Sequence, residues 1–198
     1  MFAPASSHSV GSKSTPEITA VSLTFEAAGT TGPLRGRKRS LYEGGVRVPF
    51  VVRWPNSLAA SNVNETAVIS GVDLLPTLCE LTGARVPSEI RQTLRGESAA
   101  AALRGDKEWR RSQPLFWEWR FGIAGHVLNR SPRLAIRDAK WKLLLNPDRS
   151  RIELYDITAD ASEQNNVAAQ HTDIVENLAA KALAWQKSVS SSEISPPE

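Results

Sequence analysis

The side chains best suited to chemistry in this chain are cations that gather in one short stretch. Residues 35–39 read Arg-Gly-Arg-Lys-Arg, and the glycine pair Gly44-Gly45 follows shortly after. Two adjacent glycines let the backbone bend or approach another group closely. Residues 48–52 are short, β-branched and apolar on both faces, which is typical of a strand buried in a parallel or mixed sheet. A cationic loop anchored to a buried strand predicts a place to hold an anion.

A second candidate region is aromatic. Trp117 and Trp119 lie two residues apart in a stretch that reads as a strand, so they share one face of it. Aromatic faces can stack on sugars, but core packing is the usual role of a tryptophan in a strand, and it is the interpretation we favour.

Length and composition bound the class of protein. With 198 residues, 41% of them hydrophobic, the chain can form one domain or two small ones with a hydrophobic core. A net charge of +3 predicts a local basic patch and not a general polycation. Cys79 is the single cysteine, so no internal disulfide can form. No run is long enough for a membrane span, the first residues lack the pattern of a signal peptide, and the cellular location stays open.

Nucleic-acid binding through residues 35–39 is a weaker hypothesis. The run is short, only Tyr42 beside it can stack on a base, and it leads into an apolar segment.

The elements before residue 113 are predicted from composition and from the residues that typically begin and end helices. Residues 1–30 are rich in small and polar residues and are predicted to be disordered or poorly packed. A helix is expected over 73–83, with Asp73 as its cap, Gly83 at its end and an apolar face. That face is formed by Leu74, Leu78 and Leu81. Residues 84–112 are predicted as a surface excursion with an Ala-rich helical piece over 98–103.

Beyond residue 113 the periodicity changes. Apolar residues alternate over 115–119, 133–137, 140–145 and 152–155, and turn residues separate the later runs, which predicts an antiparallel meander. A helix over 173–185 is expected to present one apolar stripe, with acidic residues in its first turn. The stripe consists of Ile174, Leu178, Ala182 and Trp185. Residues 188–198 are expected to form a polar tail.

The stretch from Lys38 to Pro49 resembles the formylglycine-dependent sulfatases, whose pattern here reads roughly Lys-x-x-x-Tyr-Glu-Gly-Gly-x-Arg-x-Pro. The resemblance continues, in the same order and spacing, through 70–78, 140–143 and 153–156, and then through Asp160, Glu163 and Asn166. It implies an α/β fold: the C-terminal part of an alkaline-phosphatase-like sulfatase, with a small subdomain of antiparallel sheet and helix. Residues 31–112 would be the end of the catalytic domain, and 113–187 the subdomain.

The resemblance also implies a chemistry that this chain carries only in part. In the family the nucleophile is a hydrated formylglycine made from the Cys of a Cys-x-Pro-x-Arg motif, beside a calcium ion held by Asp and Asn oxygens. Cys79 does not fit that motif and is expected to be a buried helix residue, and no Asp precedes Asp73. We therefore expect a fragment that lacks the nucleophile and the metal ligands and is inactive alone.

Several site residues follow from the resemblance. Lys38 would be the lysine that reaches a sulfate oxygen, the alternative being a solvated surface lysine. His126 would lie at the substrate end of the pocket, where an imidazole can bond a sulfate or a hydroxyl, the alternative being a histidine that stabilises its loop. Arg47 is expected to support the loop structurally, with Glu43 as its ion partner.

The implied function is hydrolysis of aryl or sugar sulfate esters, as in the arylsulfatases and N-acetylgalactosamine-6-sulfatases. The alternative is a non-catalytic remnant that binds sulfated glycans. The expected partner in both cases is a sulfated small molecule or glycan, with no nucleic acid and no membrane.

Overall fold

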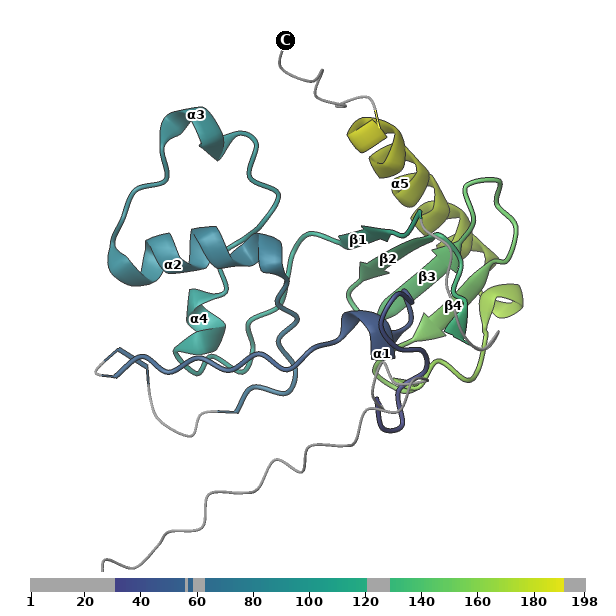
Figure 1. The fold of residues 1–198 in the computed structure, drawn as a ribbon, viewed down its shortest axis with the longest axis horizontal. Helices are drawn as coiled ribbons and strands as arrows, with labels where there is room; N and C mark the ends of the chain where they lie inside the picture. Colours follow the sequence, from purple (N-terminus) through teal and green to yellow (C-terminus); the bar gives the residue numbers. More distant parts are fainter. Residues whose placement is uncertain (1–30, 56, 59–62, 121–128, 191–198) are drawn as a thin grey trace, which may run out of the picture.

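The computed structural model describes residues 31–55, 57–58, 63–120 and 129–190. The chain forms a sheet-containing lobe and a smaller helical lobe, joined by two extended segments (Figure 1). Three predictions fall outside the described residues: disorder over residues 1–30, the end of the polar tail and the role of His126. Within the described ranges, no helix is long and apolar enough to cross a membrane.

The sheet is the meander that the alternating pattern predicts. Its strands lie in the order β1-β2-β3-β4, and each pairs antiparallel with the next. Their bounds are Leu115–Glu118 for β1, Leu134–Asp138 for β2, Trp141–Leu145 for β3 and Glu153–Asp156 for β4. Between β2 and β3 the chain turns through Ala139, whose φ of 52° lies in the left-handed region. The predicted meander is therefore confirmed.

One face of the sheet packs on the long C-terminal helix. This helix, α5, spans Thr172–Ser190 and follows the short 3₁₀ helix Ala168–Gln170. Leu178 and Ala182 of the predicted stripe are buried against strand residues, while Ile174 and Trp185 are partly buried at the edge of the same cluster. Trp185 stacks on Phe116 of β1 with ring centroids 5.2 Å apart. The predicted helix and its apolar stripe are confirmed, and the helix extends further than predicted at its C-terminal end.

The smaller lobe contains the predicted helix, but its apolar face is exposed. Helix α2 spans Leu74–Thr82 and ends at Gly83, with φ 71°, as predicted. The carboxylate of Asp73 accepts hydrogen bonds from the backbone N–H of Ser70 and Glu97, so it caps the preceding 3₁₀ turn Gly71–Asp73 and not α2 itself. Leu74 and Leu78 of the predicted apolar face are 38% and 49% exposed, so this face has little cover within the described chain. The short helices α3 (Ser88–Arg91) and α4 (Ala100–Leu103) complete the lobe, and α4 confirms the Ala-rich helical piece.

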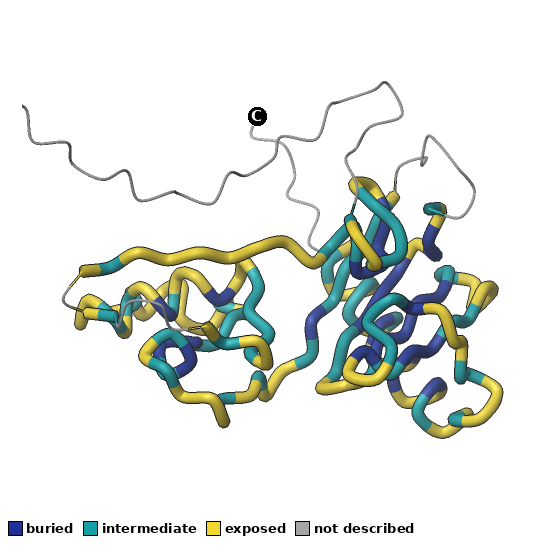
Figure 2. Tube along the Cα trace, turned by 90° about the horizontal axis from the view of Figure 1, so that it is seen from below, coloured by how far each residue is buried: buried dark blue, intermediate teal, exposed yellow. Residues whose placement is uncertain are grey.

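The segment from Val48 to Val52 is not a strand. Its backbone is extended but belongs to neither lobe, and Val48 and Val51 are 74% and 90% exposed. Figure 2 shows exposed residues along the segment that joins the two lobes. A strand that is apolar on both faces needs a neighbour to satisfy its backbone, and among the described residues nothing pairs with it. The prediction of a buried strand was therefore wrong for this chain.

The second face of the sheet is covered by the chain around the one-turn helix α1, Glu43–Val46. Leu41 and Tyr42 pack there on Ala135, Leu144 and the Tyr155 ring. The sheet is thus buried on both faces, with α5 on one side and the α1 segment on the other (Figure 1). This burial explains the continuous apolar run Leu143-Leu144-Leu145 in β3.

At the centre of this second interface lies a buried ion cluster. Lys142 of β3 is fully buried, and its Nζ donates a hydrogen bond to Oε1 of Glu43 at 2.8 Å. The same Nζ forms an ion pair with Oε1 of Glu163 at 2.9 Å. The other oxygen of Glu163 accepts the backbone N–H of Glu43 at 2.6 Å. Arg137 adds a second cation 3.6 Å from Glu43. Two carboxylates therefore face two cations in a site closed to water, as buried charges require.

A second group of contacts stabilises the same interface. Arg35 donates to the Tyr155 hydroxyl at 2.7 Å and to the Glu163 carbonyl at 3.1 Å, and its guanidinium lies 3.9 Å above the Tyr42 ring. The Tyr42 hydroxyl donates to Glu153 at 2.8 Å. Burial and the neighbouring Glu153 carboxylate raise the pKa of the Tyr42 phenol, which therefore stays a neutral donor. The α1 segment is consequently tied to β3, β4 and the chain that follows them.

Replacing Lys142 with methionine should destabilise the sheet-containing lobe by about 3–5 kcal/mol, because two carboxylates would stay buried with only Arg137 nearby. Lys140→Met is the matched control. Lys140 lies two residues away, but its side chain is 51% exposed and it pairs with Asp156 at the surface. Its loss should therefore cost about 1 kcal/mol or less. Urea unfolding followed by circular dichroism measures the free energy of unfolding of both variants. Equal losses of stability would show that the buried cluster contributes no more than a surface ion pair.

The deficit of the Lys142→Met variant should also depend on pH. Burial raises the pKa of the Glu163 carboxyl above its ordinary value, so the folded state holds this proton more tightly than the unfolded chain does. The stability contributed by this group is then present at acid pH and falls as pH rises through the raised pKa. Protonation of Glu163 also removes one of the two buried negative charges that Lys142 no longer neutralises, so the deficit should be smaller at pH 4–5 than at pH 8. A deficit that grows on acidification would contradict this assignment.

Candidate functional site

The cationic stretch 35–39 divides into groups with different roles. Arg35 belongs to the interior contacts described above. Arg37 lies beside Asn129, with its Nε 3.1 Å from the side-chain amide. Lys38 and Arg39 lie at the tip of a turn closed by the hydrogen bond from Ser40 N–H to the Arg37 carbonyl at 2.9 Å. The prediction of one loop carrying four cations therefore reduces to two cations at an exposed tip.

Both tip residues are exposed, and their side chains make no ion pair among the described residues. Arg39 has a φ of 73°, in a region that non-glycine residues seldom occupy. Adjacent Cα atoms lie about 3.8 Å apart, so two positive charges are concentrated in a small space. Such a pair can bind an anion from solvent.

The glycine pair that follows the turn explains how its backbone is held. Gly44 N–H donates to the Arg35 carbonyl at 2.8 Å, and a Cβ on Gly44 would lie 2.5 Å from the Gly36 carbonyl oxygen. A Cβ on Gly45 would overlap the Ser40 carbonyl. The close approach predicted for these glycines is thus confirmed, and the surface that they approach is the cationic turn itself.

Glu43 and Arg47 lie in different environments. Glu43 is 1% exposed, and its ion partners are Lys142 and Arg137. Arg47 is exposed, and its side chain forms no ion pair within the part of the chain that the structure describes. Burial lowers the pKa of the Arg137 guanidinium; Glu43 opposes that shift, and the like charge of Arg47 adds to it. The predicted Glu43–Arg47 pair was therefore wrong.

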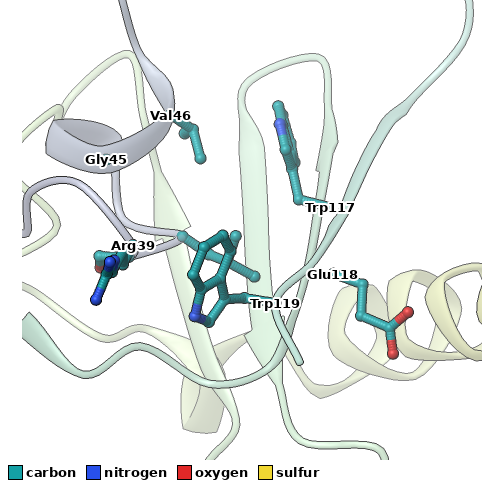
Figure 3. Close-up of a pocket in the computed structure, with 8 residues that line it drawn as sticks. Arg39, Gly45, Val46, Trp117, Glu118 and Trp119 are labelled. Atoms are coloured by element: carbon teal, nitrogen blue, oxygen red, sulfur yellow. The ribbon is translucent and has the colours of Figure 1, made fainter. Parts of the chain in front are cut away.

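A pocket of about 300 Å³ lies next to the cationic turn. Its walls come from the turn and α1 on one side and from the end of β1 on the other (Figure 3). Trp117 of β1 and Trp119, which directly follows the strand, line it, and both also pack on the cluster around Leu41 and Tyr42. Each tryptophan is half-buried, so the expectation of core packing holds for one part of each ring, while the other part faces the pocket.

The described residues do not provide a metal site or a formylglycine precursor. No three His, Cys, Asp or Glu side chains in the described ranges gather as metal ligands would. Cys79 is a half-buried residue of α2, so its predicted helical position is correct but its burial is incomplete. The residues present therefore do not fit a bound calcium ion, and no catalytic step is assigned to one.

The buried ion pair of Lys142 and Glu163 was missed by sequence reasoning, although both residues lie in stretches that resemble the sulfatases. Lys142 alternates with apolar neighbours and so resembled a solvent-facing strand residue. The run of three leucines after it was the available signal, because a strand that is apolar on both faces has no solvated side for a lysine.

Known proteins are similar to this chain in sequence and in fold. A family model described as the C-terminal region of N-sulphoglucosamine sulphohydrolase matches residues 36–188. A sulfatase of Formosa agariphila is 31% identical over 173 residues, which are 81% of this chain and 31% of that protein. An N-acetylgalactosamine-6-O-sulfatase of Bacteroides thetaiotaomicron is 31% identical over 161 residues, or 74% of this chain and 29% of that protein. The chain thus spans about a third of the length of these relatives.

Solved structures agree with the sequence relatives. A Bacteroides thetaiotaomicron protein, solved for its part in the metabolism of multiple glycosaminoglycans, matches with a TM-score of 0.57 and 27% identity. The match covers 81% of this chain and 32% of that chain. The crystal structure of i-CgsB matches with a TM-score of 0.56 and 26% identity, over 74% of this chain and 30% of that one. From its family-model match and its fold, this chain belongs to the sulfatases, as a member of the family of N-sulphoglucosamine sulphohydrolase C-terminal regions.

Proposed function

We propose that this chain supplies the sulfate-binding turn of a sulfuric ester hydrolase that acts on sulfated sugars or aryl sulfates. Family membership supports the general chemistry, because relatives of this chain are named as sulfatases. The observation that carries the proposal is Lys38, an exposed ammonium at the tip of a turn whose base is tied to the buried ion cluster.

The role proposed for Lys38 is electrostatic. An ammonium is a compact point charge, suited to a sulfuryl oxygen on which charge increases in the transition state. The buried cluster holds the base of the turn, so the cation need not be repositioned as the reaction proceeds. Formylglycine and calcium, which the family implies, would have to be provided outside the described residues.

A second candidate function is a non-catalytic binder of sulfated glycans. The sequence favours it on one point, because no Cys-x-Pro-x-Arg or Ser-x-Pro-x-Arg motif occurs in the 198 residues. Both functions use the same cationic turn, and they differ in whether turnover accompanies binding.

The 198-residue chain alone should show no hydrolysis of an aryl sulfate above the uncatalysed rate, with or without calcium. Nucleophilic attack supplies a large part of the rate enhancement of such enzymes, and the motif for that nucleophile is missing. A chromogenic aryl sulfate measures this directly. Turnover that persists after repurification would show that this chain carries a nucleophile of its own.

Lys38→Ala should lower turnover strongly in a chimaera in which residues 31–187 replace the matching third of the Formosa agariphila sulfatase. Its melting temperature should not change, because the side chain is exposed and unpaired among the described residues. Arg85→Ala, which removes an exposed cation from the other lobe, is the matched control and should change neither quantity. Normal turnover in Lys38→Ala would make Lys38 a solvated surface residue and refute the proposed site.

A further inference from the structure

The pocket beside the cationic turn exists because small residues lie next to its large aromatic side chains. Trp117 pairs across the sheet with Ala135, so no large neighbour on β2 fills the space next to the indole. On the opposite wall stands Gly45, which has no side chain and cannot accept one. Small residues on both sides thus leave about 300 Å³ between the cationic turn and the wall formed by the two tryptophans.

The surfaces of the pocket are of two kinds. Trp117 of β1 and Trp119, two residues further along the chain, provide apolar, polarisable ring surface on the same wall of the pocket. Arg39 provides a guanidinium at the rim, where it has no ion partner among the described residues (Figure 3). Glu118 is also among the lining residues, but its carboxylate is directed away from Arg39 (Figure 3) and accepts hydrogen bonds from Arg120 and Gln186. The pocket therefore combines an aromatic wall with an available positive charge and no available carboxylate.

This combination matches one class of ligand. Sugar rings carry C–H groups on their faces that pack on indoles, and their hydroxyl or sulfate substituents at the ring edge need polar partners. A volume of about 300 Å³ is at the lower end for small-molecule sites, which fits a single ring and not a long oligosaccharide. Lys38 is the residue next to Arg39, so a ligand with its sulfate at Lys38 can place a neighbouring ring in the pocket.

We propose that the Trp117–Trp119–Arg39 pocket is a subsite for a hexopyranose ring next to the sulfated unit, with Arg39 contacting an anionic substituent of that ring. This inference rests on the proposed function, since it takes Lys38 as the sulfate ligand. It makes the substrate a sulfated oligosaccharide and not a small aryl sulfate. A structural neighbour, i-CgsB, was solved with k-i-k-neocarrahexaose bound, at a TM-score of 0.51 and 26% identity, so this hexasaccharide is a reasonable probe.

The first test needs no substitution. Indole N–H signals of the full chain are followed by NMR while k-i-k-neocarrahexaose is added, and again with inorganic sulfate. The chain has six tryptophans, four of which lie outside the pocket and serve as internal controls. We expect the hexasaccharide to shift the Trp117 and Trp119 signals selectively, and sulfate to leave them in place. Unshifted Trp117 and Trp119 signals at saturating hexasaccharide would overturn the proposal, as would equal shifts of all six.

The second test separates the subsite from the sulfate site. Trp117→Leu removes the ring, and Arg39→Asn removes the charge while tolerating the left-handed backbone at that position. Each should weaken hexasaccharide binding about fivefold or more and leave inorganic sulfate affinity within about twofold, whereas Lys38→Ala should weaken both. Trp109→Leu, a half-buried tryptophan outside the pocket, is the control and should change neither.

The outcomes distinguish the two proposals. If Arg39→Asn and Trp117→Leu bind the hexasaccharide normally while Lys38→Ala does not, the subsite is refuted and the sulfate site stands. If Lys38→Ala binds both probes normally, the proposed function fails, whatever the tryptophan variant does. Should Trp117→Leu not fold, Arg39→Asn and the indole signals decide the question.

Discussion

The arrangement of this chain depends on the burial of one lysine. Lys142 has no access to water, and its charge is balanced only because Glu43 and Glu163 reach it from outside the sheet. A buried ammonium is costly unless its partners are in place. The sheet therefore needs the α1 segment as much as that segment needs the sheet.

This mutual dependence connects elements that lie far apart in the sequence. Glu43 lies 99 residues before Lys142, and its backbone N–H is bonded to Glu163, 120 residues further along the chain. Arg35 makes a parallel connection to Tyr155 and to the Glu163 carbonyl. Through Gly44, which bonds to the Arg35 carbonyl, these contacts hold the base of the turn that presents Lys38 and Arg39. The exposed cations are thus carried by a turn whose backbone is held in place by these buried contacts.

The helical lobe and the extended segment before it show the opposite behaviour. Their large apolar residues are exposed in this chain, for example Val51 at 90% and Leu78 at 49%. The described residues leave these side chains in contact with solvent, as also for Val48 at 74% and Leu75 at 45%. The two lobes therefore differ in kind: one closes around its own core, and the other leaves several large apolar side chains exposed.

The limits of sequence reasoning follow from the same division. The meander and α5 were predictable because their burial partners lie within the chain, so period-2 and period-3.6 patterns correspond to real inner faces. Residues 48–52 and the leucines of α2 carry equally strong apolar patterns, but these side chains are exposed in the described chain. The prediction of a buried strand over 48–52 was therefore wrong. The burial of Lys142 was not predicted for another reason. An alternating pattern assigns a lysine to the solvent-facing side of a strand, and only tertiary contacts show that both faces of β3 are covered. The pocket could be predicted only in part. The shared face of Trp117 and Trp119 follows from their spacing in the sequence, whereas the positions of Gly45 and Ala135 near them are known only from the three-dimensional structure.

The most direct test of the buried cluster's central role is native-state hydrogen exchange at the backbone amide of Glu43. This N–H donates to the buried Glu163 carboxylate at 2.6 Å, so it should exchange only when the cluster opens. We predict a free energy of opening equal to that of β3 core amides such as Leu143 and Leu145, with all of them reduced together in Lys142→Met. Exchange at Glu43 far faster than in β3 would show that the α1 segment separates from the sheet on its own, and the central role of the cluster would be contradicted.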